Sequence, residues 1–148
     1  MRIAAVDRGD NLLAWGGNDF HSRWSEYVCY NTHLVLIKEG SGFYYYNKGT
    51  LANAGASYML TDQANQYGAG TYTLTVDMKA DKACSCRVRL KANSASADQT
   101  VDLTTSWKKV TLTFPVTKDQ VNNAALIFMT LLKDSGVAFR NPVLTHSK

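Results

Sequence analysis

The chain has 148 residues, of which 45% are hydrophobic and 19% are charged, as in one ordinary globular domain. Sixteen Lys and Arg residues are set against twelve Asp and Glu residues, and the formal net charge of +4 at pH 7 includes no run of like charge. The modest, scattered charge argues against nucleic-acid binding, and no apolar stretch is long enough to insert into a membrane.

The first part of the sequence predicts short strands joined by polar loops. Residues 1–10 lack the apolar run of a signal peptide and are expected to form an N-terminal arm or an edge strand. The chain is therefore expected to be soluble, and either unexported or excised from a longer protein. Short strands are expected at Glu26 to Tyr30 and His33 to Ile37, and a glycine-containing turn then leads into the aromatic run Phe43 to Tyr46. These last two segments predict a hairpin.

The segment from Asn47 to Gly70 is rich in Gly, Ala, Asn, Gln and Ser, and only Ser57 to Thr61 is strand-like. This composition predicts a region dominated by loops. Loops of this size often carry ligand contacts.

The clearest periodicity lies between Thr71 and Lys91. Apolar residues fill every second position of both halves, namely Tyr72, Leu74, Val76 and Met78, and then Cys84, Cys86, Val88 and Leu90. This alternation is typical of strands that are buried on one face. Because residues 80–83 form a short polar link, the two strands are expected to pair as an antiparallel hairpin with both apolar rows on one side. The alternating threonines of the first half, with Arg87 and Arg89, would then lie on an outer face.

The three cysteines do not predict a disulfide framework. On one strand face the Cβ atoms of Cys84 and Cys86 would be about 6–7 Å apart, whereas a disulfide needs about 3.8 Å. Cys84 and Cys86 are therefore expected to be unpaired and to face the core.

The C-terminal part predicts four further strands. Two are expected at Gln99 to Leu103, after a turn at Asn93 to Asp98, and at Ser106 to Val116. The run Ala124 to Leu132 is apolar on both faces and fits a central strand or a short helix, and Val137 to Thr145 closes the chain. Eight to eleven short strands without a convincing amphipathic helix predict an all-β antiparallel sandwich, preferably a jelly roll, in which residues 1–148 form one domain.

Four segments in this order resemble the galactose-binding-like jelly rolls of carbohydrate-binding modules, in particular copies found in tail and fibre proteins of tailed bacteriophages. They are NLLAWGGNDFHSRW, GTYTLTVDMKAD, LTTSWKKVTLTFPV and SGVAFRNPVLT. The resemblance implies a sugar site made of aromatic platforms on a sheet face or at loop ends. It also implies that the recurring tryptophans, here Trp24 and Trp107, are buried structural residues.

A sugar site needs flat aromatic rings for stacking and planar polar groups for the hydroxyls. Strand alternation places Tyr44 and Tyr46 on one face and Phe43 and Tyr45 on the other. If Phe43 faces the core, Tyr44 and Tyr46 are exposed. The candidate ligand-binding residues are therefore Tyr44 and Tyr46 first, then Tyr30, Tyr67 and Trp15, with Asp77, Arg87 and Arg89 as hydrogen-bonding groups. The alternative is that these tyrosines only cover a core edge and the arginines are a solvated face.

The sequence offers little for a metal site. The resemblance implies a structural calcium near the chain ends in many such modules, and Asp19 with its neighbour Asn18 is the candidate here, although no EF-hand loop is present. The expected cofactor is therefore none, with calcium left open. His21, His33 and His146 are far apart and lack partners at zinc-ligand spacing, which argues against zinc.

No motif of a hydrolase, metalloprotease or nucleotide-binding enzyme is present, and the acidic residues are scattered singly, so a non-enzyme is expected. With the resemblance, this predicts a carbohydrate-binding-module-like domain on a bacteriophage virion, in a tail, a fibre or a capsid decoration. Its partners would be a host glycan or bacterial surface polysaccharide and other virion subunits, and the resemblance alone suggests a homotrimer. Two alternatives remain open: an assembly protein without a sugar site, and a module excised from a secreted, extracellular polysaccharide-degrading enzyme.

Overall fold

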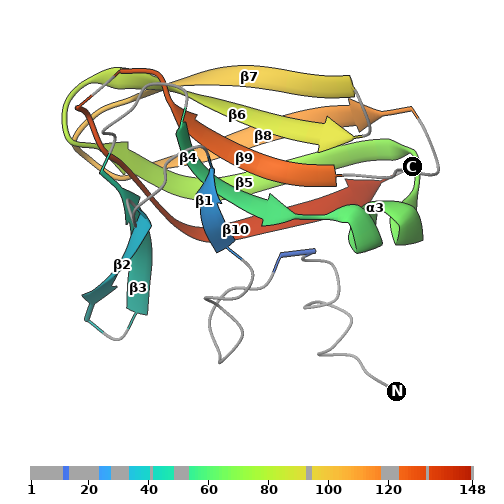
Figure 1. Ribbon diagram of the computed structural model, residues 1–148, viewed down its shortest axis with the longest axis horizontal. Coiled ribbons are helices and arrows are strands. Elements are labelled where there is room, and N and C mark those ends of the chain that lie inside the picture. The colour runs from blue at the N-terminus through green and yellow to red at the C-terminus, as the bar shows by residue number, and fades with distance from the viewer. Residues whose placement is uncertain are drawn as a thin grey trace.

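The computed structural model describes residues 12–13, 24–27, 34–40, 42–48, 54–92, 95–117, 124–132 and 134–147. Within these residues, ten strands form two five-stranded antiparallel sheets that pack face to face (Figure 1). The predicted all-β jelly-roll sandwich is confirmed.

Sheet A has the strand order β1-β4-β9-β6-β7. Its strands are β1 (Trp24–Tyr27), β4 (Ala54–Met59), β9 (Ala124–Thr130), β6 (Cys84–Ala92) and β7 (Ala95–Leu103). The central strand β9 is buried at all seven positions, because its two faces are both covered, as the uniformly apolar run had indicated.

Sheet B has the strand order β2-β3-β10-β5-β8. Its strands are β2 (Leu34–Glu39), β3 (Gly42–Asn47), β10 (Val137–Ser147), β5 (Gly70–Ala80) and β8 (Lys108–Val116). The predicted hairpin around the aromatic run is confirmed, since β2 and β3 pair from Leu34 opposite Asn47 to Glu39 opposite Gly42. Gly40 allows the tight turn with its positive φ of 58°.

The predicted pairing between the two halves of Thr71 to Lys91 is wrong. β5 lies in sheet B between β10 and β8, whereas β6 lies in sheet A between β9 and β7. The alternation itself is correct, because Leu74, Val76 and Val88 are at most 1% exposed. The two apolar rows therefore face each other across the core instead of lying side by side. The polar rows consequently point away from each other, on opposite outer faces of the sandwich.

A short helix, α3 (Thr61–Tyr67), occupies the segment that was expected to consist of loops. It is anchored by buried Leu60 and Ala64, and it ends at Gly68, whose φ is 72°. A hydrogen bond from the Ala124 backbone N–H to Thr61 Oγ1 ties its first residue to β9. Strand β7 also includes residues 95–98, where a turn was expected.

The last strand contains an irregularity at Asn141-Pro142. The pairing of β10 with β5 shifts between Arg140 and Val143, and Asn141 has a positive φ of 53°. This β-bulge adds one residue to β10. In a regular strand, Phe139 and Leu144 would point to opposite faces because they are an odd number of positions apart, but with the bulge both point into the core.

Cys84 and Cys86 are both free thiols, as predicted. Cys86 is fully buried, and burial raises the pKa of its thiol to about 12. None of the described helices is long and apolar enough to cross a membrane. The expectation for residues 1–10 and the side chain of Trp24 lie outside the described residues.

Neighbouring positions of β6 should respond oppositely to substitution. Val88→Asp should unfold the domain or cost at least about 3 kcal/mol, because Val88 is 0% exposed and a carboxylate there would be buried without a partner. Arg87→Ala should change stability by less than about 0.5 kcal/mol, because Arg87 makes only a half-exposed ion pair at 3.9 Å. Thermal and urea unfolding of both variants would check this. The opposite ranking would overturn the assignment of the inner and outer faces.

Candidate functional site

The outer face of sheet B presents a row of aromatic and charged side chains. In β3, Tyr45 points into the core at 3% exposure, so strand alternation turns Tyr44 and Tyr46 outward, as predicted. The pairing of β3, β10 and β5 then places Ala138 beside Tyr46, with Lys79 on the other side of Ala138. Residues from three adjacent strands therefore share one surface.

Trp107 joins this surface from the link between β7 and β8. Its ring centre lies 5.2 Å from that of Tyr44 with the planes at 77°, an edge-to-face contact. The expectation that Trp107 is a buried structural residue is therefore wrong. It is half-buried, and its printed contacts are with outward-facing side chains of sheet B.

Two cations lie over these rings. The Arg140 guanidinium carbon is 4.0 Å from the centre of the Trp107 ring. The Lys79 ammonium is 4.7 Å from the same ring centre and 5.2 Å from that of Tyr44. All three distances are within the range of cation–π attraction, so the aromatic pair and the two cations form one cluster, which we call the ring cluster.

Arg140 is held by two carboxylates as well as by Trp107. Its Nη1 donates to Glu39 Oε1 at 2.6 Å, and its Nε donates to Asp77 Oδ2 at 3.4 Å. Lys109, which is well exposed, is 3.9 Å from Asp77. Arg140 therefore links β10 to the tip of β2 and to β5, and its planar group is fixed in position.

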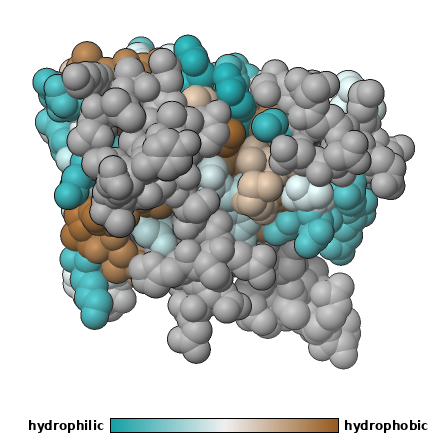
Figure 2. Space-filling view, viewed as in Figure 1, coloured by the Kyte–Doolittle hydropathy of each residue, from teal (hydrophilic) through white to brown (hydrophobic). Residues whose placement is uncertain are grey.

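A hollow of about 230 Å³ lies next to the ring cluster. It is lined by Ile37, Tyr44, Tyr46, Lys79, Ala80, Asp81 and Ala138. It is smaller than the roughly 300–1,000 Å³ pockets that enclose drug-sized ligands, which suits one ring of a chain lying across the face. Along one side, β2 supplies half-buried apolar residues, and Figure 2 shows hydrophobic surface over the β2–β3 hairpin at the lower left.

Tyr46 forms a fixed wall of this hollow. Its hydroxyl donates to Asp81 Oδ2 at 2.5 Å, and the Gly136 backbone N–H donates to the same oxygen at 2.9 Å. Its ring lies so close to Gly136 that a methyl group there would clash with it. Burial is the larger cause and the hydrogen bond to Asp81 the next, and together they raise the pKa of Tyr46 to about 12.

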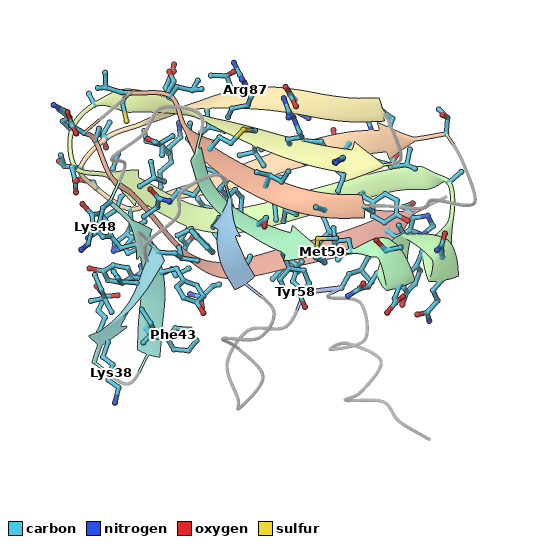
Figure 3. All side chains as sticks on the ribbon, in the orientation of Figure 1. Lys38, Phe43, Lys48, Tyr58, Met59 and Arg87 are labelled. Carbon is cyan, nitrogen blue, oxygen red and sulfur yellow. The ribbon has the colours of Figure 1, made fainter. Side chains whose placement is uncertain are left out.

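Among the predicted site residues that the structure describes, three are brought together and three are not. The three that are not are Arg87, Arg89 and Tyr67. Tyr44, Tyr46 and Asp77 share the outer face of sheet B. Arg87 and Arg89 lie on the outer face of sheet A, and Figure 3 shows Arg87 and Phe43 at opposite margins of the molecule. The prediction that Arg87, Arg89 and Asp77 share one polar face is therefore wrong, because β5 and β6 belong to different sheets.

The arginines of sheet A have a structural partner. Arg89 donates to both carboxylate oxygens of Asp98, at 2.7 and 2.9 Å, and these hydrogen bonds lower the pKa of Asp98. Arg87 lies 3.9 Å from the same carboxylate. These ion pairs with Asp98 link β6 to β7 at a partly exposed edge. They agree with the alternative prediction that the two arginines belong to a solvated face.

Tyr67 lies elsewhere, on α3. Its ring centre is 5.5 Å from that of His146, which also contacts Tyr72 and lies 2.8 Å from the Ala69 carbonyl oxygen. Tyr67 therefore packs against the core next to the helix and does not join the ring cluster. Tyr30, Trp15 and Asp19 lie outside the described residues, and their roles stay predictions.

The described part of the chain contains no group of three or more His, Cys, Asp or Glu residues that could hold a metal ion. The calcium hypothesis involves Asp19, which is outside that part, so it stays a prediction.

Several residues of the candidate site were not predicted from the sequence. Lys79 shares the outward row of β5 with Asp77, so strand alternation could have identified it. Arg140 follows inward-facing Phe139 and could have been found in the same way. Trp107 and Glu39 carry no such signal, because their positions depend on the link between the sheets and on the pairing of β2.

The solved structures that share this fold include several carbohydrate-binding modules. A CBM4 structure is 18% identical over 84% of this chain and 86% of its own, with a TM-score of 0.63. The CBM22-1 xylan-binding domain from Paenibacillus barcinonensis Xyn10C is 12% identical over 94% and 96%, with a TM-score of 0.70. The chain thus has the carbohydrate-binding-module type of jelly roll. The resemblance seen in the sequence is confirmed at the level of the fold.

A bacteriophage protein shares the fold as well. The enzymatically active domain of tailspike protein 4 of bacteriophage CBA120 is 11% identical to this chain, with a TM-score of 0.66. The match covers 93% of this chain and 22% of that one. No protein-family model matches the sequence, and no curated protein is significantly similar to it.

The raised tyrosine pKa values predict a loss of stability at alkaline pH. Burial raises the pKa of Tyr45 to about 12, and it also raises the pKa of Tyr72. Unfolded tyrosine ionises near pH 10, so the stability from these buried neutral phenols is complete below pH 10 and falls between pH 10 and 12. Melting temperatures measured from pH 8 to 12, with phenolate absorbance, would check this.

Tyr46→Phe supplies the control, because it removes one of the titrating groups and should make the alkaline decline shallower. If every tyrosine ionised near pH 10 in the folded protein, the assignment of these buried phenols would be wrong.

Proposed function

We propose that this protein is a non-catalytic carbohydrate-binding domain whose glycan site is the outer face of sheet B. The observation that carries the proposal is the edge-to-face pair of Tyr44 and Trp107, 5.2 Å apart, beside a hollow of about 230 Å³. The carbohydrate-binding-module fold supports it. The apolar face of a pyranose would pack on the rings while its hydroxyls meet the surrounding polar groups.

The charged groups of the site suit sugar hydroxyls. Arg140 presents a planar donor whose orientation is fixed by Glu39 and Asp77, so little side-chain freedom is lost when it binds. Carboxylate oxygens of Glu39 and Asp77 accept hydrogen bonds from hydroxyls. Tyr46 and Asp81 close the far side of the hollow and position the sugar ring against Tyr44.

We place this domain on the surface of a bacteriophage virion, where it contributes to attachment to a bacterial surface polysaccharide. The shared fold of the tailspike domain supports this placement. A shallow site of this kind binds one sugar weakly, and many copies on one particle would raise the overall affinity without new contacts. Association with other virion subunits, including a homotrimer, would supply those copies.

A second placement is supported by the xylan-binding domain that shares the fold. In that case the domain is an extracellular module that holds a polysaccharide-degrading enzyme on its substrate. The same ring cluster would bind the glycan in both placements. The neighbouring genes separate them, because a catalytic domain in the same reading frame favours the enzyme module and phage structural genes favour the virion.

Removal of either ring should weaken glycan binding. Tyr44→Ala and Trp107→Ala should each lower the affinity by at least about tenfold, because each substitution removes an aromatic ring whose surface the bound sugar would cover. The measurement is an array of bacterial surface polysaccharides and plant glycans probed with a multimerised protein, followed by calorimetry on the best ligand. Arg87→Ala, on the opposite sheet, is the matched control and should bind like the unmodified protein.

Binding that survives both ring substitutions would move the site away from sheet B. If the multimerised protein binds no glycan at all, the proposal fails and a purely structural role in assembly takes its place.

A further inference from the structure

We infer that Lys79 makes the proposed site selective for acidic glycans, whose sugar units carry carboxylates. The inference rests on the proposed function, because it assumes that the glycan lies on the ring cluster. It concerns one side chain of that cluster and the class of sugar that this side chain favours.

The two cations of the ring cluster differ in their partners. Arg140 is bound by Glu39 at 2.6 Å and by Asp77 at 3.4 Å. No ion pair links Lys79 to an acidic residue within the described ranges; its ammonium group contacts only the Tyr44 and Trp107 rings, at 5.2 and 4.7 Å. Among the described residues, no carboxylate therefore lies within ion-pair distance of the Lys79 ammonium.

The ion pairs around the rings agree with this difference. Lys109 and Arg140 pair with the carboxylates of Asp77 and Glu39, whereas Lys79 forms no ion pair among the described residues. Asp81 also lines the hollow and keeps its negative charge, because its Oδ2 atom accepts hydrogen bonds from two neutral donors, the Tyr46 hydroxyl and the Gly136 N–H. The hollow thus has an acidic wall that is held by hydrogen bonds at Asp81, and a cation without an ion pair on the side of the ring cluster.

Lys79 also covers the surface on which a sugar would stack. A pyranose that approaches the Tyr44 and Trp107 rings must move the ammonium group away from them. The cation–π contact is weak enough at a partly exposed site for this displacement to occur. A neutral sugar offers the displaced ammonium only neutral hydroxyl oxygens, whereas a carboxylate on the sugar receives it in a charge-assisted ion pair. Selectivity arises from this difference between the two ligands.

The test uses acidic polysaccharides and their carboxyl-reduced forms, which keep the same linkages but are neutral. Polygalacturonate, alginate, hyaluronan and an acidic bacterial capsular polysaccharide form the panel, each with its reduced counterpart. We expect the unmodified protein to bind at least one acidic member about 2- to 5-fold more tightly than its reduced form at 0.1 M salt, the range for one partly exposed ion pair. At 1 M salt the preference should shrink, because the charges are screened.

Lys79→Met keeps the length and apolar stem of the side chain and removes the charge. In this variant, the acidic and reduced forms should bind about equally, and the reduced form should bind at least as well as it does to the unmodified protein. Lys109→Met is the matched control, because it removes one charge from the same sheet face at a residue that is 72% exposed and has no contact with the rings. It should retain most of the preference for the acidic form.

The outcomes separate this inference from the proposed function. If the reduced forms bind as tightly as the acidic forms, the inference about Lys79 is overturned while glycan binding at the ring cluster stands. If Lys109→Met abolishes the preference as fully as Lys79→Met, the selectivity belongs to the overall charge of the face and the assignment to Lys79 fails. If no member of the panel or of the glycan array binds, both proposals fail.

Discussion

The packing of sheet A against sheet B decides which side chains remain for the surface. Strands such as β5 bury alternate residues between the sheets, so their remaining residues form rows on an outer face, whereas the central strand β9 is buried throughout. Tyr45 and Phe139 fill the core with ring centres 5.7 Å apart, and their neighbours Tyr44 and Arg140 are thereby turned outward. The chemistry of the outer face of sheet B is therefore a direct result of how its inner face is packed.

Arg140 is the residue that joins the parts of the site. It contacts the Trp107 ring, and its guanidinium group reaches both Glu39 at the end of β2 and Asp77 on β5. These partners come from positions up to 101 residues apart in the sequence. A planar cation that binds carboxylates and an aromatic face at once can hold a loop tryptophan against a sheet. The Arg140 guanidinium is thus held in place within the ring cluster, while Lys79, which makes no ion pair among the described residues, contacts the two rings less rigidly.

Alternation along single strands was predicted correctly from the sequence, whereas the pairing between strands was predicted correctly for the β2–β3 hairpin and wrongly for β5 and β6. The inward position of Val76 and Val88 follows from a local pattern that any strand partner would satisfy. Whether β5 pairs with β6 or with β8 depends on contacts between distant segments, and a link as short as residues 81–83 can either close a hairpin or cross between sheets. For the same reason, the outward positions of Tyr44 and Asp77 were predicted correctly, whereas Arg87 and Arg89 were expected on the same face as Asp77 and lie on the opposite sheet.

The bulge at Asn141 has a consequence for the way β10 can vary. The inward-facing residues of β10 have odd numbers before the bulge, as in Phe139, and even numbers after it, as in Leu144. The extra residue shifts the inward-facing positions by one. Without it, one half of the strand would turn its core residues to solvent. The half that carries Arg140 is thereby uncoupled in register from the half that pairs with Thr71 to Thr75. The length of the bulge, rather than any side chain in it, keeps the guanidinium group on the outside of the molecule.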